Sequence, residues 1–173
     1  MEKSNPITAI QKGLIISGFL IVLSTSIYFL GLQTEKWAQW VSYIILMGGV
    51  LWACISYGKE NDNNVSFGNV FAHGFKVSAI ITCMMIISST LFIFLFPEIK
   101  ENAIEIARAE MEKNPQITEE QIEMALSMTQ KWFMAFMIGG ILLAYLIFGC
   151  IASLIGGAVT KKNPSNPFEQ TNM

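Results

Sequence analysis

Charged residues are scarce in this sequence: they make up 14% of its 173 residues, whereas about 25% is usual for a soluble domain. The shortage is local, because several long runs contain no charged residue at all. Runs of this kind are typical of membrane spans and not of a large soluble core. They also lack the alternation of period two that membrane-spanning strands require, so the sequence predicts helices.

Cysteine and histidine are rare as well. Cys54, Cys83 and Cys150 lie in three different apolar runs, and without a Cys-x-x-Cys or paired Cys/His spacing we predict neither a zinc site nor a disulfide framework. The single histidine, His73, has no Cys, Asp or Glu at ligand spacing. We therefore expect no metal and no cofactor. His73 is either an interfacial polar side chain or a pH-sensitive or partner-binding group.

Several classes of function lack their usual residues. The net charge is −2 and no long basic cluster occurs, which argues against a nucleic-acid partner. The apolar runs contain no Asp, Glu, Arg or Lys away from their ends, and ion-coupled transporters generally need such groups at depth. No nucleophile with a paired base and no phosphate-binding glycine loop is recognisable, so we expect no catalytic residues and no enzyme.

Four apolar runs predict an all-α integral membrane four-helix bundle, with spans at about 13–32, 37–57, 77–96 and 132–159. The segment 58–64 is rich in Gly and Asn and is expected to form a loop. The whole chain, 1–173, is expected to be a single membrane domain. Its tail, 163–173, is polar and holds two prolines, and we expect it to be flexible.

The polar region 97–131, between the third and fourth spans, predicts a helical hairpin. Asn114-Pro115 breaks the helical pattern, because proline disfavours helix in the residue before it. Thr118 to Gln121 then reads as a capping box, so we expect the fourth span to extend out of the membrane as one continuous helix. The region holds eight acidic and four basic residues. Its acidic surface is either simply solvated or a site for a cation or a basic partner.

The segment 66–76 combines a helix start with an apolar face. Ser66 is a good N-cap, and apolar residues recur behind it at helical spacing. We expect this segment to lie at the membrane interface or to rise through it before spanning. Its candidate interaction or packing residues are Phe67, Gly68, Phe71, His73, Gly74, Phe75 and Lys76.

Small residues repeat at four-residue spacing late in the fourth span, which lets another backbone approach closely. The candidates for helix packing are Gly149, Ala152, Ser153, Gly156 and Gly157. This pattern fits either packing inside the bundle or homodimerisation.

The sequence resembles domain of unknown function 4199 in four features. These are the four spans, the segment Ser66-Phe67-Gly68-x-x-Phe71-x-x-Gly74-Phe75, the polar hairpin, and the Gly-rich last span that ends in Lys-Lys-x-x-Pro. The resemblance covers about residues 7–168. It implies a small inner-membrane protein of Gram-negative bacteria, and no catalytic residues to transfer. It also implies that the Phe and Gly residues of the 66–76 segment matter together.

The sequence thus predicts a non-enzymatic structural or accessory subunit in the bacterial inner membrane. Its expected partners are the lipid bilayer and either a second copy or another membrane protein. The distribution of Lys and Arg near the span ends places both termini in the cytoplasm, with the hairpin on the other side. The alternatives are a small transporter or channel for a cationic or uncharged solute, and a pH or envelope-stress sensor that uses His73.

Overall fold

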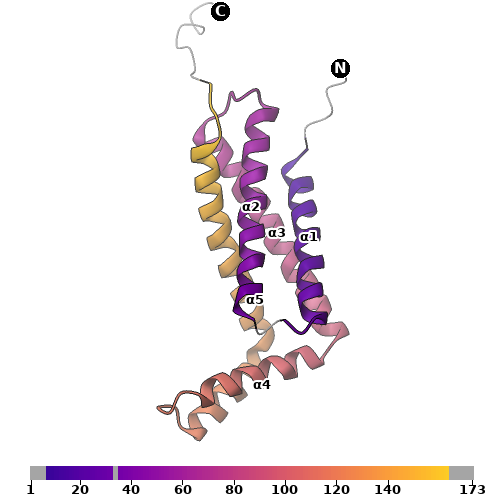
Figure 1. Cartoon of the computed structure of the whole chain (residues 1–173), viewed down its shortest axis with the longest axis vertical. Helices are drawn as coiled ribbons and strands as arrows, with labels where there is room; N and C mark the ends of the chain where they lie inside the picture. Colours follow the sequence, from indigo (N-terminus) through magenta and orange to yellow (C-terminus); the bar gives the residue numbers. More distant parts are fainter. Residues whose placement is uncertain (1–6, 33–34, 164–173) are drawn as a thin grey trace, which may run out of the picture. The chain divides into compact units, whose positions relative to one another are not determined.

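The structure, a computed structural model, describes residues 7–32 and 35–163. Within these ranges all regular structure is helical (Figure 1), so the all-α prediction is confirmed. The helices are α1 (Ala9–Phe29), α2 (Lys36–Glu60), α3 (Phe67–Leu95), α4 (Glu98–Glu112) and α5 (Glu119–Val159). All but α4 are long and apolar enough to cross a membrane. Most of the tail that we expected to be flexible, 164–173, lies outside the described residues.

The chain divides into two compact units, and its being a single membrane domain stays a prediction. Of the described residues, the bundle unit comprises 7–32, 35–84 and 144–163, and the hairpin unit comprises 85–143. Each unit has its own packing and is treated by itself below.

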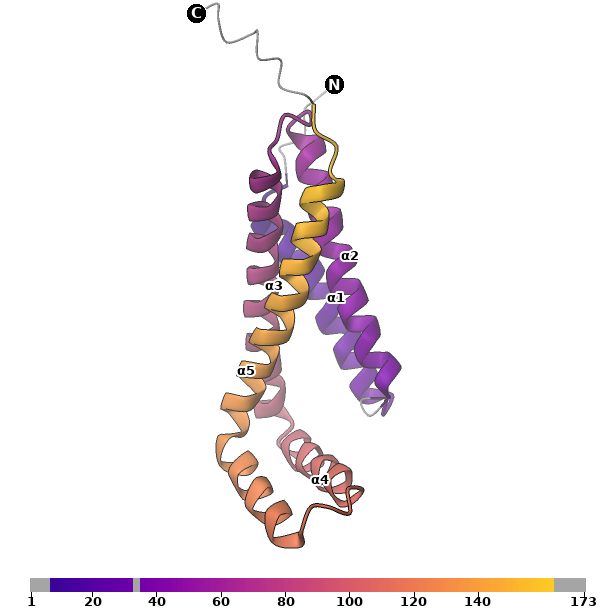
Figure 2. The same cartoon turned by 90° about the vertical axis from the view of Figure 1, so that its left-hand side faces the viewer.

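In the bundle unit, α1, α2, the first part of α3 and the last part of α5 lie side by side (Figures 1 and 2). Glycine brings α1 close to its neighbours, because a methyl group added at Gly13 would lie 2.7 Å from Cγ2 of Ile80 in α3. Further along, the ring of Tyr43 in α2 stacks on Phe148 in α5, with centroids 4.5 Å apart. Close backbones and stacked rings are how helices associate where lipid supplies no hydrophobic drive between them.

Helix α1 begins four residues before the predicted start of the first span. Thr8 and Gln11 form a capping box, in which each side chain bonds to the other residue's backbone. This arrangement satisfies two otherwise unpaired donors at the helix start. As a result Lys12, which the sequence pattern places outside the first span, belongs to the first turns of α1.

Helix α2 runs to Glu60, three residues beyond the predicted end of the second span. Gly58 does not break the helix, because it is buried against the side chain of Thr160. The turn comes instead at Asp62 and Asn63, whose φ angles are 52° and 59°, a conformation that Asp and Asn tolerate better than most residues. The predicted N-cap of α3 is confirmed: the hydroxyl of Ser66 accepts a hydrogen bond from the backbone N–H of Asn69 at 3.2 Å.

The hairpin unit contains α4 and the first part of α5, joined by a turn at residues 113–118 (Figure 2). The predicted capping box is confirmed, since Thr118 and Gln121 exchange hydrogen bonds of 3.0 and 3.4 Å. The expectation of an uninterrupted α5 was wrong. The backbone leaves helical geometry at Trp132, with φ −109° and ψ 17°, at the point where the charged segment gives way to the uncharged span.

Candidate functional site

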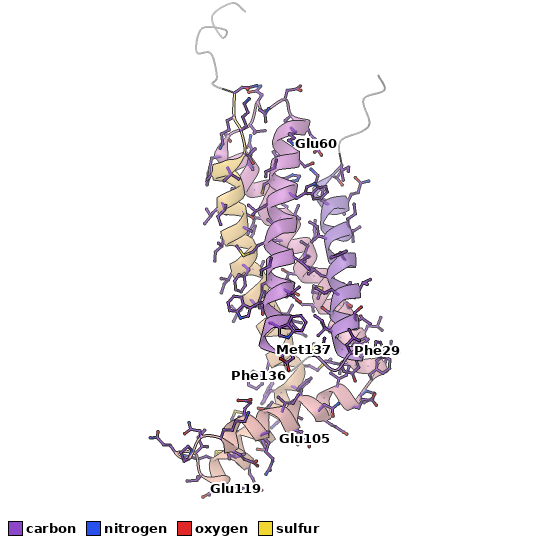
Figure 3. The ribbon with its side chains drawn as sticks, in the orientation of Figure 1. Phe29, Glu60, Glu105, Glu119, Phe136 and Met137 are labelled. Atoms are coloured by element: carbon purple, nitrogen blue, oxygen red, sulfur yellow. The ribbon has the colours of Figure 1, made fainter. Side chains whose placement is uncertain are left out.

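An ion pair with a buried lysine and a partly exposed glutamate lies where α1 begins and α2 ends. The side chain of Lys12 is wholly buried, and its Nζ donates to Oε2 of Glu60 at 2.9 Å. Ser56, one turn earlier in α2, donates from its hydroxyl to the other oxygen of Glu60 at 2.8 Å. The side chain of Glu60 is 21% exposed. Glu60 is labelled in Figure 3, at the end of the bundle unit where α2 finishes.

Lys12 lies near the N-terminus of α1 and Glu60 at the C-terminus of α2. Each charge alone is unfavourable for its own helix. A cation near a helix N-terminus and an anion near a helix C-terminus both oppose the helix dipole. Because α1 begins beside the end of α2, each charge faces the favourable pole of the neighbouring helix. Lys12 carries three N–H donors, and Glu60 is its one partner within the described residues. The arrangement therefore depends on both residues being present.

His73 lies beside this ion pair. Its ring stacks on Tyr57 of α2, with centroids 4.2 Å apart and planes inclined by 18°. Its Nε2 is buried, and no group in the described ranges forms a hydrogen bond with it. Lys12, Glu60 and Lys76 are close enough to His73 to act on it electrostatically. The end of the bundle unit thus gathers an ammonium, a carboxylate and an imidazole from three helices.

The next layer of the bundle unit is packed around Cys54. A methyl group added at Gly74 would lie 2.5 Å from its Sγ and 2.8 Å from the hydroxyl of Ser153, and one added at Gly156 would lie 2.6 Å from the same sulfur. Farther along α5, a methyl group at Gly149 would lie 2.5 Å from Ser78. At each of these levels the helices approach so closely that even a methyl group does not fit.

The hydroxyl groups of this layer are occupied within their own helices. Ser78 donates to the carbonyl of Gly74 at 3.0 Å, and Ser153 donates to the carbonyl of Gly149 at 2.7 Å. Such bonds satisfy a buried hydroxyl inside an apolar environment.

The structure brings some of the predicted site residues together and separates others. All five helix-packing candidates lie on α5: Gly149, Ala152, Ser153, Gly156 and Gly157 are buried, and Gly157 lies against the ring of Phe67. In the 66–76 segment, Gly74 faces the interior, whereas Gly68 and Lys76 are exposed.

The phenylalanines of the 66–76 segment form a separate row along α3. The rings of Phe67, Phe71 and Phe75 stack in sequence, with centroid distances of 6.4 and 6.1 Å. Lys162 lies 5.9 Å from the ring of Phe67. The sequence suggests a single apolar face for the 66–76 segment. In the structure there are two: Gly74 faces into the bundle, and the phenylalanines lie along its outside.

Lys12 and Glu60 are absent from the sequence-based candidates. The signal for Lys12 was the Thr-x-x-Gln pattern at residues 8–11, which starts the helix before the lysine. Glu60 gave no comparable signal, because Gly58 and the Asn-rich segment after it favour a loop. Among residues 7–32 and 35–163, no three or more His, Cys, Asp and Glu residues lie together as a metal site would require.

The four helices of spanning length and composition within residues 7–32 and 35–163 indicate a multi-pass membrane protein. Residues 11–162 match the family described as protein of unknown function, DUF4199, and because the match covers most of the sequence, the chain belongs to this family. No curated protein and no solved structure matches the chain.

Proposed function

We propose that the chain is a non-enzymatic structural or accessory subunit of the bacterial inner membrane that acts by binding a second copy or another membrane protein. The close contact of α2, α3 and α5 at Gly74, Gly156 and Gly149 supports a structural role over a path for solutes. Where a methyl group does not fit, no solute passes between the helices. The hydroxyls there bond to their own helices, so they do not line a polar path.

The proposed orientation has both termini in the cytoplasm. The starts of α1 and α3 and the end of α5 carry most of the lysines outside the hairpin, and such residues favour the cytoplasmic side. Lys12 counts for less in this balance than it does by sequence alone, because Glu60 neutralises it. A reporter that fluoresces only in the cytoplasm, fused after residue 173, should be bright. A dark fusion would reverse the orientation.

Native mass spectrometry of the tagged protein, extracted gently from its own membrane, tests the accessory role. The expected spectrum shows the chain in fixed stoichiometry with a second polypeptide or with copies of itself. A chain that is strictly monomeric and alone in several mild detergents would contradict the proposal. An unrelated four-span protein with the same tag serves as the control for non-specific carry-over.

The pair of buried Lys12 and partly exposed Glu60, with His73 near it, favours a second candidate, a small transporter or channel. Ionisable groups that face the interior of a membrane bundle often belong to proton or ion pathways. Vesicles that contain the purified protein would then show flux of a cationic or uncharged solute, and Glu60→Gln would abolish it. Wild-type vesicles without flux for a broad panel of solutes would remove this candidate.

A further inference from the structure

The charged part of α5, residues 119–131, is apolar on two opposite faces. Ile122 and Leu126 are 3% and 6% exposed and form the buried side of the hairpin unit. Met124 and Met128 are 63% and 56% exposed, and two positions along a helix place a side chain on nearly the opposite side. A hairpin that needed only to fold would keep this second face polar.

The exposed apolar face continues into Trp132, which is 54% exposed. Met124 and Met128 stand four residues apart and therefore on the same side of the helix, and Trp132 follows four residues later at the kink. We call these three residues the Met stripe. Glu120 stands one turn before Met124 on the same side, and Glu123 is the residue beside it.

Within the described residues, five acidic side chains of the hairpin unit form no ion pair, and neither does the exposed Lys131, which precedes Trp132. Its ion pairs use Arg108 with Glu112 and Glu119, at 3.7 and 3.3 Å, and Lys113 with Glu110, at 2.8 Å. Lys100 lies over the ring of Phe133 at 5.9 Å. The carboxylates left without an ion pair are those of Glu98, Glu101, Glu105, Glu120 and Glu123. Figure 3 shows Glu105 on α4 and Glu119 at the start of α5.

We infer that the Met stripe, with Glu120 and Glu123, docks a basic amphipathic helix of a partner protein. The inference rests on the proposed accessory role and names the kind of partner. Methionine side chains are flexible and polarisable, which suits a surface that accepts a helix, and apolar anchors at four-residue spacing match the apolar face of a docked helix. The unpaired carboxylates select a cationic partner and disfavour both anionic lipid and a second acidic hairpin.

A binding assay with a defined probe tests the charge and the shape of this surface. The full chain is placed in nanodiscs of zwitterionic lipid and titrated into a fluorescent 18-residue helical peptide of leucine and lysine. We expect saturable binding in excess of that to empty nanodiscs, and affinity should fall as salt rises from about 50 to 300 mM. The same peptide with glutamate in place of lysine should not bind. Equal binding of both peptides would overturn the inference.

Two variants separate the apolar contacts from the charges. Met124→Gln with Met128→Gln should weaken binding about tenfold or more, because it removes central apolar anchors. Glu120→Gln with Glu123→Gln should weaken binding and flatten the salt dependence. Ala109→Ser, at an exposed position of α4, is the matched control and should bind like wild type. Since all these positions are exposed, the variants should keep the wild-type melting temperature.

Photocrosslinking identifies the occupant directly. A benzophenone amino acid in place of Met128 should crosslink to the leucine–lysine peptide, whereas the same group in place of Asn102, an exposed residue of α4, should not. Products that join the group to lipid acyl chains would show that the stripe lies in the bilayer surface. Products that join two copies of the chain would show a self-interface. Either result as the main product would overturn the inference.

The assays also distinguish this inference from the proposed accessory role. If a partner co-purifies equally with wild type and with the Met124→Gln/Met128→Gln variant, the docking surface is wrong and the accessory role stands. If the leucine–lysine peptide binds at the stripe but the chain purifies alone and monomeric, the docking surface stands and the accessory role is wrong.

Discussion

The ammonium of Lys12 and the carboxylate of Glu60 lie 2.9 Å apart, although 48 positions separate them in the sequence. Lys12 is wholly buried, so its charge depends on this partner. We expect Glu60→Gln to lower the free energy of unfolding by about 3 kcal/mol, because it leaves a buried charge without compensation. Unfolding in mixed micelles, followed by helical circular dichroism, measures the loss.

The double variant Lys12→Met with Glu60→Gln should regain most of that stability, to within about 1 kcal/mol of wild type, since it removes the stranded charge. Lys59→Met, which changes the exposed neighbour of Glu60, should leave stability unchanged. If Glu60→Gln were as stable as Lys59→Met, the ion pair would contribute nothing to the fold.

Gly74 and Gly68 belong to the same sequence motif but have opposite surroundings. A methyl group at Gly74 meets Cys54 and Ser153 at 2.5 and 2.8 Å, whereas at Gly68 the nearest atom is the hydroxyl of Ser66 at 3.9 Å. Gly74→Ala should destabilise the chain by about 1–3 kcal/mol through overpacking. Gly68→Ala should be neutral or stabilising by up to about 1 kcal/mol, because alanine favours helix. Similar melting temperatures for the two variants would contradict the packing at Gly74.

The stack of His73 on Tyr57 predicts that an aromatic ring is needed at position 73. His73→Phe keeps the stack and removes the buried, unpartnered Nε2, so its stability should equal or exceed that of wild type. His73→Ala should lose about 0.5–1.5 kcal/mol. If His73→Phe were the less stable of the two, the imidazole would have a polar role that the stack does not explain, and the sensor hypothesis would gain.

Thr118 starts α5 through its capping box with Gln121. Thr118→Ala should cost about 1 kcal/mol of local stability. Hydrogen exchange at the backbone amides of residues 119–123 should accelerate about fivefold. Ser127→Ala, which alters an exposed hydroxyl in the same helix, is the control and should leave these amides unchanged. Equal exchange in wild type and Thr118→Ala would show that the cap does not hold the helix start.

The sequence was most informative where local chemistry decides the structure. The runs without charge predicted the four long helices, and Ser66, Thr118 and Asn114-Pro115 predicted a helix cap, a capping box and a break. These features depend on hydrogen bonds within a few residues, or on one apolar run at a time. Reading them required no knowledge of which helices touch.

The candidate site was beyond sequence reasoning because it depends on contacts between helices. From the sequence, Gly58 predicts a helix break before Glu60. The packing of Thr160 against Gly58, which the sequence does not reveal, accompanies the continuation of α2 to Glu60. Lys12 reads as a charge that flanks a span until Glu60 is placed beside it. The Met stripe was missed for a different reason. An apolar residue within a polar helix is expected to be buried. The spacing of the apolar residues gives two faces on this helix, and it does not say which of them the neighbouring helix covers.

The ion pair also has a consequence for the order in which the chain assembles. Lys12 lies on α1 and Glu60 on α2, and both helices precede α3 and α5 along the chain, so the two residues can meet before most of α3 and all of α5 have been made. Until Glu60 has been made, α1 carries an ammonium that its mature surroundings bury completely, so we expect the pair to form once α2 is in place. The end of α5 is made after α1 to α4 and must fit its glycines against Cys54 and Ser78, so it packs into a space that α2 and α3 already line.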